Sequence, residues 1–221
     1  MKDGASMSLP YPRVEERVSP MLVEQATAFQ AATLYEAAGK KGVLPSAIRP
    51  LDLRMELCGP AITVKAAPCD NLWIHRALAI AEPGDVLVVD CSGFFEAGYW
   101  GEVMNVSAVA RGLGGLVING CVRDGLRLID SGFPVFARGL CLRGTTKQMD
   151  APGFLNRPLV LGDALIEPGD LVRGDCDGVA ALPRKDLPTI LEQAQIREDK
   201  EAQSMTRLRA GETTMAIKGW R

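Results

Sequence analysis

Histidine and aromatic residues are scarce in this chain of 221 residues, which has one histidine and 5% aromatic residues. Its six cysteines include no pair with the Cys-x-x-Cys spacing of a metal clip. A zinc site made from cysteine and histidine needs several such ligands in register, so the composition argues against one. We expect the cysteines to be reduced, mostly buried thiols in a cytoplasmic protein.

An excess of positive charge is also absent. The chain has 25 lysine and arginine residues against 27 aspartate and glutamate residues, for a formal net charge of -2, and no run of like charge stands out. A protein that binds nucleic acid must neutralise several phosphates with a clustered basic surface. The balance of charge therefore predicts no nucleic-acid partner.

Long apolar runs are missing too. The longest apolar stretches have the length of single strands, which is too short for a helix that crosses a bilayer. Residues 1–18 are polar and lack the apolar core of a signal peptide. We expect no membrane association and a cytoplasmic location. Hydrophobic residues still make up 47% of the chain, which is enough for the core of one mixed α/β domain.

Helix and strand patterns alternate through the middle of the chain. Apolar periodicity predicts a helix over residues 20–38, and Asp70 is expected to cap a second helix that runs to Ala81. The other elements predicted here are strands at 57–66, 86–89, 116–118 and 133–137 and helices at 101–111 and 124–132. Strands that alternate with helices pair in parallel through right-handed crossovers.

The last third of the chain has a different pattern. Short strands between glycine and proline turns are expected at 159–160, 164–166, 170–173 and 178–182. A long charged helix with one apolar stripe is predicted from Lys185 to Gly211, and such a helix is typical of a subunit contact. The expected organisation is an N-terminal arm over 1–19, an α/β domain over 20–183, and a C-terminal helix and tail over 184–221.

The segment Gly120-Cys121-Val122-Arg123-Asp124-Gly125 lies where an apolar strand ends and a helix begins. Ligands of α/β proteins gather at the carboxyl ends of strands. A carboxylate there can hold a hard cation, and the adjacent guanidinium can bind a substrate carboxylate through two hydrogen bonds. An arginine–aspartate pair is also common as a helix cap, and the dipeptide alone favours that interpretation.

Three further segments follow strand ends and shift the balance toward a site. Gly101 and Glu102 begin a helix, where free backbone N–H groups suit a carboxylate ligand and Glu102 could reach a metal through water. Asn71 and His75 lie around another helix start, where His75 could orient a substrate or simply fill space. The third segment is the loop with Ser92, Gly93 and Glu96. Together these features predict a small anionic ligand and a metal.

The same segments resemble the RraA-like family. The resemblance rests on Pro83–Asp90, Tyr99–Glu102, Gly120–Asp124 and Gly132–Ala137, and it extends over residues 20–213. Within the family the chain is most similar to the class II 4-hydroxy-4-methyl-2-oxoglutarate and 4-carboxy-4-hydroxy-2-oxoadipate aldolases. That branch shares Tyr35–Gly39, Asp70 and Asn71 with His75, Gly144 and Thr145 with Lys147, Arg197–Glu201 and Arg209–Glu212.

The resemblance implies a β/β/α swivelling-domain sandwich with an N-terminal helix and a long C-terminal helix. It also implies self-association as trimers or dimers of trimers, with the active site between subunits. In that site Asp124 would bind Mg²⁺ or Mn²⁺, Arg123 would bind substrate and stabilise an enolate, and Glu102 would hold metal-bound water. The other residues implied are Gly101, Val103, Met104, Asn71 and His75 at the substrate, and Glu198 or Glu201 from the neighbouring subunit.

The reaction implied is cleavage of a hydroxylated 2-oxo acid to pyruvate and a second oxo acid. Decarboxylation of oxaloacetate is expected as a side activity, because loss of carbon dioxide generates the same enolate. One departure favours another function: the aldolases carry an acid three positions after the metal aspartate, where this chain has Arg127, with Asp130 further on. A missing acid is also typical of family members that bind a ribonuclease or helicase without catalysis. A third interpretation is a related metal-dependent enzyme that acts on another oxo acid.

Overall fold

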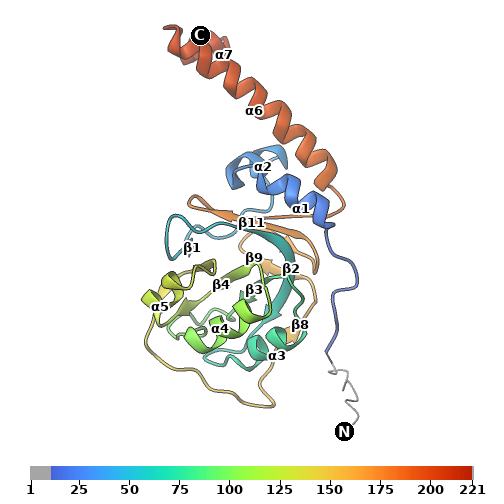
Figure 1. Ribbon diagram of the computed structural model, residues 1–221, viewed down its shortest axis with the longest axis vertical. Helices are drawn as coiled ribbons and strands as arrows, with labels where there is room; N and C mark the ends of the chain where they lie inside the picture. The colour runs from blue at the N-terminus through green and yellow to red at the C-terminus, as the bar shows by residue number, and fades with distance from the viewer. Residues whose placement is uncertain (1–10, 221) are drawn as a thin grey trace.

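Four parallel strands form the centre of the molecule (Figure 1). They are β2 (Leu57–Lys65), β3 (Val86–Asp90), β4 (Gly115–Asn119) and β6 (Val135–Ala137), in the spatial order β6-β4-β3-β2. This computed structural model describes residues 11–220 of the chain. The parallel pairing expected from the sequence is confirmed by the registers of β2 with β3, β3 with β4, and β4 with β6.

Apolar side chains cover both faces of this sheet. On β3, Leu87 and Val89 belong to the core beneath α3 (Leu72–Ile80), α4 (Glu102–Ala110) and α5 (Gly125–Asp130). Val86 and Val88 point the other way, because successive side chains of a strand alternate between faces. Helices therefore form one outer layer, as the crossover connections require.

The second outer layer is antiparallel. It contains β9 (Leu159–Leu161) paired with β10 (Ala164–Ile166), and β11 (Leu171–Asp175) paired with β12 (Gly178–Leu182). β11 also pairs with β2, so this layer continues from the parallel sheet. The chain thus has the expected β/β/α sandwich. Two-residue strands not expected from the sequence complete it: β1 (Arg49–Pro50), β5 (Cys121–Val122), β7 (Gly139–Leu140) and β8 (Phe154–Leu155).

The prediction of a single helix over residues 20–38 is wrong in one respect, because this segment forms two helices. They are α1 (Pro20–Thr27) and α2 (Ala31–Ala37). Side chains of β11 bind the backbone at the break: the Phe29 carbonyl accepts a hydrogen bond from Arg173 Nε at 3.0 Å, and Ala31 N donates to Asp175 Oδ2 at 2.7 Å. These partners replace the hydrogen bonds of a continuous helix, so tertiary contacts override local propensity.

Removal of the Arg173 guanidinium is expected to destabilise the fold by about 3–5 kcal/mol, the usual cost of breaking a buried charged network. Arg173 is 1% exposed, and its side chain donates to the carbonyls of Phe29, Leu57 and Gly174, as well as to Glu56 Oε2 at 2.7 Å. Arg173→Met leaves these acceptors without their donor. Urea denaturation measures the loss.

The matched control is Arg54→Met. Within the described part of the chain Arg54 pairs only with Asp52, and its side chain is 87% exposed. Exposed pairs of this kind contribute little, so this variant should unfold at the same urea concentration as the parent protein. An unchanged midpoint for Arg173→Met would contradict the structural role given to Arg173.

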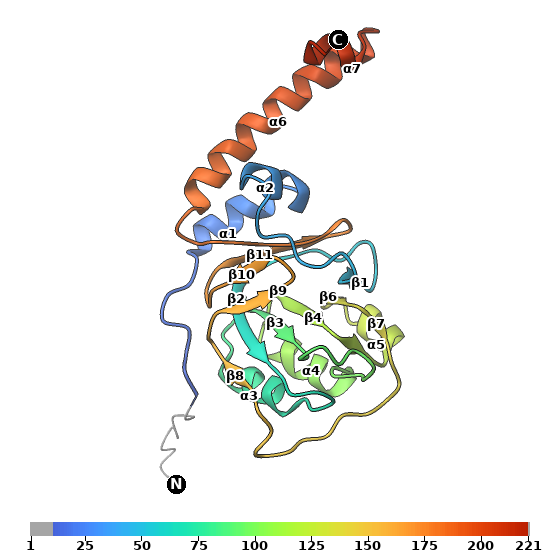
Figure 2. The ribbon, with the colours of Figure 1, turned by 180° about the vertical axis from the view of Figure 1, so that it is seen from behind.

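The C-terminal part of the chain leaves the sandwich as a long arm (Figures 1 and 2). α6 (Leu187–Arg209) agrees with the predicted helix within two residues at each end, and α7 (Thr214–Lys218) follows it. The buried residues of α6 all lie in its first half, where it packs on α1 and α2: Leu187, Ile190, Leu191 and Ala194. None of the helices within residues 11–220 combines the length and apolar character that crossing a membrane requires.

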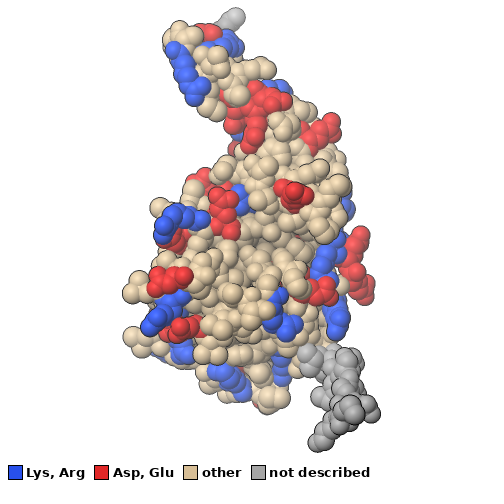
Figure 3. Space-filling view, in the orientation of Figure 1, with Lys and Arg blue, Asp and Glu red and all other residues tan. Residues whose placement is uncertain are grey.

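Charged side chains of both signs are interspersed over the face of the molecule seen in Figure 3. The helices α3, α4 and α5 lie on this side of the molecule. Neither acidic nor basic side chains predominate on this face. The pattern agrees with the near-equal numbers of acidic and basic residues in the sequence.

Candidate active site

A hollow of about 250 Å³ lies where α3 and α4 begin, beyond the carboxyl ends of the parallel strands. Loops after β2, β3 and β5 and the loop between β7 and β8 contribute to it. Its lining consists of Asn71, His75, Gly98, Tyr99, Gly101, Val103, Met104, Arg123, Asp124, Gly144, Thr145 and Lys147. Seven of the residues expected at the substrate or metal are therefore brought together: Asn71, His75, Gly101, Val103, Met104, Arg123 and Asp124.

Asp124 does not cap its own helix. Its backbone has a left-handed conformation with φ of 61°, and its side chain makes no capping hydrogen bond to α5. Instead, Oδ2 accepts a hydrogen bond of 3.0 Å from the backbone N–H of Glu102, the first residue of α4. The positive end of the α4 dipole thus faces this carboxylate. Among the described residues nothing bonds to Oδ1, and the side chain is 40% exposed.

Gly101 makes this approach possible. A Cβ atom at position 101 would lie 2.5 Å from Asp124 Oδ2 and 3.2 Å from Arg123 Nε. The first distance is shorter than any real contact of such an atom, so a side chain would displace the carboxylate. Gly101 is therefore needed for the close approach of α4 to the Arg123-Asp124 segment.

A backbone hydrogen bond fixes the position of Arg123, and its guanidinium remains available to bind a ligand. Arg123 N donates to the Trp100 carbonyl at 2.8 Å, and the side chain is half-exposed. Its Nε lies 3.9 Å from Asp124 Oδ2, a loose ion pair that leaves the donor fork free. Nη1 lies next to Gly144, where a Cβ would be 3.9 Å away. This arrangement can bind a carboxylate beside Asp124.

Asn71 contributes a buried acceptor without a partner. The residue is 5% exposed, and its Nδ2 donates to the Tyr99 carbonyl at 2.9 Å and to Met104 Sδ at 3.4 Å. Its Oδ1 is buried and has no hydrogen-bond partner among the described residues. Buried polar atoms are nearly always paired. Because Asn71 also lines the hollow, this unpaired acceptor belongs to the wall of the candidate site.

Asp70 fastens the loop between β7 and β8 to this hollow. The prediction that Asp70 caps α3 is wrong by one residue, because the N-cap is Asn71, but Asp70 Oδ1 accepts from the backbone N–H of Leu72, the first residue of α3, at 2.9 Å. Asp70 Oδ2 accepts from Thr146 Oγ1 at 2.9 Å and Gln148 N at 2.7 Å. The loop thereby brings Lys147 into the lining, a position that the sequence did not assign to the site. The signal for it was the Gly144-Thr145-Lys147 segment in the family resemblance.

Tyr99 is a further lining residue that the sequence did not assign. Its hydroxyl donates to the Phe94 carbonyl at 2.9 Å and accepts from Cys69 N at 2.8 Å. Burial raises the pKa of this hydroxyl far above its ordinary value of 10.0. Tyr99 therefore keeps its proton at neutral pH, and its role is to position Asn71 and the loops around it.

His75, the only histidine, gives a clean test of the electrostatics of the site. Burial lowers its pKa below 6.5, the nearby charge of Lys147 lowers it further, and Asp70 opposes the shift. We expect its single imidazole NMR resonance to titrate below pH 6.5 and Lys147→Met to raise this pKa. Since the unfolded imidazole takes up its proton first, His75 stabilises the fold above pH 6.5, and this contribution falls as pH decreases toward the folded pKa.

Lys41→Met is the control for this titration, because Lys41 is exposed and does not line the hollow. It should leave the His75 pKa unchanged. A pKa of 6.5 or above in the parent protein, or one insensitive to Lys147→Met, would disprove the proposed environment of His75.

Several residues expected from the sequence lie outside this hollow. Glu102 contributes its backbone N–H, but its exposed side chain is not part of the lining. Arg127 and Asp130 are exposed on α5, and neither forms an ion pair with Asp124. The remaining expected positions outside the lining are Ser92, Gly93 and Glu96. The cation at position 127 thus forms no ion pair with the carboxylate of Asp124.

Glu198 and Glu201 are far from Asp124 within one chain. Both lie on α6, on the other side of the sandwich from α4 and α5 (Figure 2). Glu201 pairs with Arg197 at 2.9 Å. Either glutamate can reach a site like this one only in another copy of the chain, so their expected catalytic role stays a prediction.

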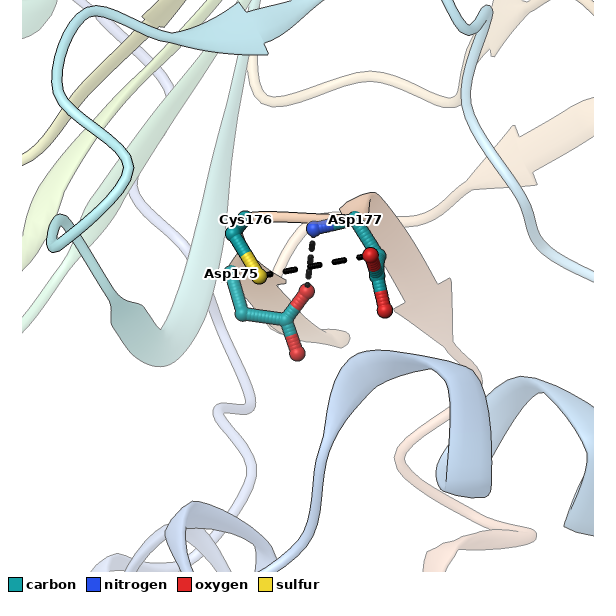
Figure 4. Close-up of side chains that lie close together, drawn as sticks. All are labelled: Asp175, Cys176 and Asp177. Carbon is teal, nitrogen blue, oxygen red and sulfur yellow. Dashed lines mark hydrogen bonds between the residues drawn. The ribbon is translucent and has the colours of Figure 1, made fainter.

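One other group of metal-type ligands occurs within residues 11–220, at Asp175, Cys176 and Asp177 (Figure 4). Asp175 Oδ2 accepts from Ala31 N, and its Oδ1 accepts from Asp177 N at 3.0 Å. Both carboxylate oxygens of Asp175 therefore accept hydrogen bonds from the backbone, whereas Asp124 accepts one only through Oδ2 among the described residues. The expectation of mostly buried thiols is wrong, since all six cysteines are free but only Cys91 is fully buried.

Comparisons with known proteins agree with this architecture. The model of the RraA-like family, described as Aldolase/RraA, matches residues 27–181. A proposed 4-hydroxy-4-methyl-2-oxoglutarate aldolase of Halalkalibacterium halodurans is 35% identical over 178 residues, covering 80% of this chain and 82% of that protein.

Two solved structures are similar over most of the chain. Streptomyces coelicolor RraAS2, described as an unusual member of the RNase ES inhibitor RraA family, has a TM-score of 0.75 at 28% identity, covering 86% of this chain and 98% of its own. An uncharacterized protein from Pseudomonas syringae has a TM-score of 0.77 at 25% identity, covering 91% of this chain and 98% of its own. The β/β/α fold expected from the sequence is confirmed by these neighbours.

Proposed function

Because the chain belongs to the RraA-like family, we propose that it is a metal-dependent aldolase. Its substrates are 4-hydroxy-4-methyl-2-oxoglutarate or 4-carboxy-4-hydroxy-2-oxoadipate, which it cleaves to pyruvate and a second oxo acid. The observation that carries this proposal is the orientation of Asp124. Its carboxylate turns away from its own helix, and one oxygen stays open in a hollow that Arg123 and Lys147 also line.

The donor set at Asp124 fits Mg²⁺ or Mn²⁺. Oδ1 has no partner among the described residues, and the absence of a Cβ atom at Gly101 lets the carboxylate keep this position. Mg²⁺ commonly binds through one or two carboxylates and keeps several waters. When bound, such a cation polarises the 2-oxo group and stabilises negative charge on its oxygen.

Among the side chains of the protein, Arg123 contributes most to stabilising the negative charge that develops during cleavage. Cleavage breaks the bond between C3 and C4, and its electron pair moves into the pyruvate unit to form an enolate. The guanidinium of Arg123 binds the substrate carboxylate and faces the oxygen on which negative charge develops. Lys147 adds a second positive charge to the same hollow. Both charges are in place before the reaction, so little reorganisation is needed.

The 4-hydroxyl must lose a proton as the second oxo group forms. Asn71 Oδ1, the unpaired buried acceptor, holds this hydroxyl in position. We assign the Glu102 carboxylate as the base that takes up this proton through water and returns it to C3 of the enolate to give pyruvate, because its backbone N–H bonds to Asp124 while its side chain stays exposed. Oxaloacetate is decarboxylated by the same groups, since its loss of carbon dioxide leaves the same enolate.

The site is proposed to be completed by other copies of the chain. Large apolar side chains are exposed on α5 at Leu126 and on the loop between β7 and β8 at Leu142 and Met149, and others project from the C-terminal arm at Met205, Met215 and Trp220. Contiguous exposed apolar surface marks interaction sites. Trimers or dimers of trimers would cover it and bring Glu198 or Glu201 of a neighbour to the site.

A coupled assay of pyruvate formation tests the proposed function. Activity on the two hydroxylated oxo acids should disappear with EDTA and return with Mg²⁺ or Mn²⁺. Activity that survives both metal removal and the Asp124→Ala substitution would overturn the proposal. A panel of other oxo acids identifies the substrate if the metal requirement holds but these two acids are poor substrates.

A second candidate function is binding to a ribonuclease or helicase without catalysis. Two observations favour it: the similarity to Streptomyces coelicolor RraAS2 and the presence of Arg127 where the aldolases carry an acid. Capture of such a partner by a protein that forms no pyruvate under any metal condition would decide for this function.

A further inference from the structure

A second hollow of about 300 Å³ adjoins the candidate site along the groove between α3 and α4. The two hollows share His75, Val103 and Met104. Beyond these shared residues the second hollow is lined by Leu78, Ala79, Ser107 and Arg111. The two hollows are therefore neighbours, and the exposed side chain of Val103 lies between them.

The direction of the groove follows from the fold. α3 and α4 are in contact, and both begin at the carboxyl edge of the parallel sheet, so they run away from Asp124 side by side (Figure 1). Arg111 is the C-cap residue that follows α4, nine positions after Glu102. A rise of about 1.5 Å per residue puts its Cα roughly 13 Å farther along the groove.

Arg111 presents a guanidinium without an acidic partner. Its Nη2 donates to the carbonyls of Ala79 at 3.2 Å and Ala81 at 3.1 Å, at the end of α3. Within residues 11–220 no carboxylate forms an ion pair with it. The two carbonyls hold the guanidinium in place, while Nε and Nη1 remain as donors. A guanidinium fixed in this way is suited to a carboxylate.

The middle of the groove is apolar. Leu78 and Met104, each 5% exposed, form its base, and Val103 stands beside them with 83% of its surface exposed. Positive charge lies at both ends, from Arg123 and Lys147 near Asp124 and from Arg111 at the far end. A ligand that matches this pattern has an anionic group at each end and methylene groups between them.

We propose, on the basis of the aldolase function proposed above, that this groove is a subsite for the distal part of the substrate. Its preferred ligands are 2-oxo acids that carry a second carboxylate at the far end of an aliphatic chain. Arg111 binds that carboxylate, and Leu78, Val103 and Met104 contact the chain. Arg111 is thus a residue that determines specificity and takes no part in bond cleavage.

Calorimetric binding to the Mg²⁺-supplemented full-length protein tests this proposal. The probes are 2-oxoglutarate, 2-oxoadipate, 2-oxopimelate and 2-oxosuberate, with 2-oxooctanoate as the long acid that lacks a distal carboxylate, and pyruvate as the short reference. Affinity should rise along the dicarboxylate series. 2-Oxosuberate should bind about tenfold or more tightly than 2-oxooctanoate, as expected for a charge-assisted hydrogen bond.

Arg111→Met should remove the difference between 2-oxosuberate and 2-oxooctanoate and leave pyruvate binding unchanged, whereas Arg111→Lys should keep part of the difference. Arg76→Met is the matched control, because Arg76 also bonds a carbonyl, that of Met149, but does not line the groove. It should alter neither affinity. Melting temperatures of all variants show whether loss of the Ala79 and Ala81 contacts has unfolded α3.

Equal binding of 2-oxosuberate and 2-oxooctanoate would overturn the subsite, as would an Arg111→Met variant that loses pyruvate binding to the same extent. The two proposals fail separately. Pyruvate formation from short substrates with no effect of chain length would refute only the subsite. Binding of 2-oxosuberate that depends on Arg111, in a protein without lyase activity, would refute only the aldolase function.

Discussion

Replacement of Asp124 by asparagine is expected to lower kcat/KM for pyruvate formation on the order of a thousandfold, which corresponds to about 4 kcal/mol of transition-state stabilisation. Asparagine keeps the size of the side chain and an oxygen that can accept from Glu102 N, so the local contact at 3.0 Å can persist. It removes the negative charge that would hold the cation. The measurements are the coupled pyruvate assay over a range of Mg²⁺ concentrations and the melting temperature.

Asp130→Asn is the matched control for this substitution. Asp130 is also an exposed aspartate of this segment, at the last residue of α5, but it does not line the hollow. It should retain full activity and the same Mg²⁺ dependence as the parent protein. An Asp124→Asn variant with a tenth or more of the parent activity would rule out Asp124 as the principal metal ligand.

Arg123→Met is expected to reduce kcat by roughly 100- to 1000-fold, the usual effect of removing one donor that stabilises a developing oxyanion. Arg123→Lys should recover only part of this loss, because an ammonium group carries the charge without the two-donor fork. A second measurement is inhibition by oxalate, which resembles the planar enolate of pyruvate. Its affinity should fall more than that of pyruvate if Arg123 stabilises the enolate.

Arg127→Met is the control for Arg123, since it removes an arginine one helical turn away that lies outside the hollow. Activity should stay unchanged, because Arg127 is exposed and forms no ion pair with Asp124. A large gain of activity in Arg127→Met would show instead that this cation weakens the metal site. Equal losses in both variants would contradict the separate role given to Arg123.

The central strands were predictable because each is buried on both faces and must be a nearly continuous apolar run. Val86–Val89 is such a run, and the strand found there extends it by one residue to Asp90. The short strands at Arg49–Pro50 and Phe154–Leu155 carry no such signal. They exist because strands distant in the sequence provide hydrogen-bond partners, β6 for the first and β2 for the second.

The break between α1 and α2 escaped prediction for a related reason. Apolar residues continue through the segment with helical spacing, and no proline or glycine interrupts it. The groups that end α1 and start α2 are Arg173 and Asp175, which lie 144 residues away in the chain. The helix propensity of the residues between α1 and α2 contributes less free energy than these buried, charge-assisted hydrogen bonds.

The sequence by itself determined that Arg123 and Asp124 follow a strand end, that strands and helices alternate, and that charge is balanced, since each depends on neighbouring residues or on composition. Only the tertiary structure decided where Asp124 points, because its partner Glu102 N lies 22 residues away. It also brought Lys147 into the site and carried Glu201 away from it within one chain. Such placements depend on the packing of distant elements, which no local pattern records.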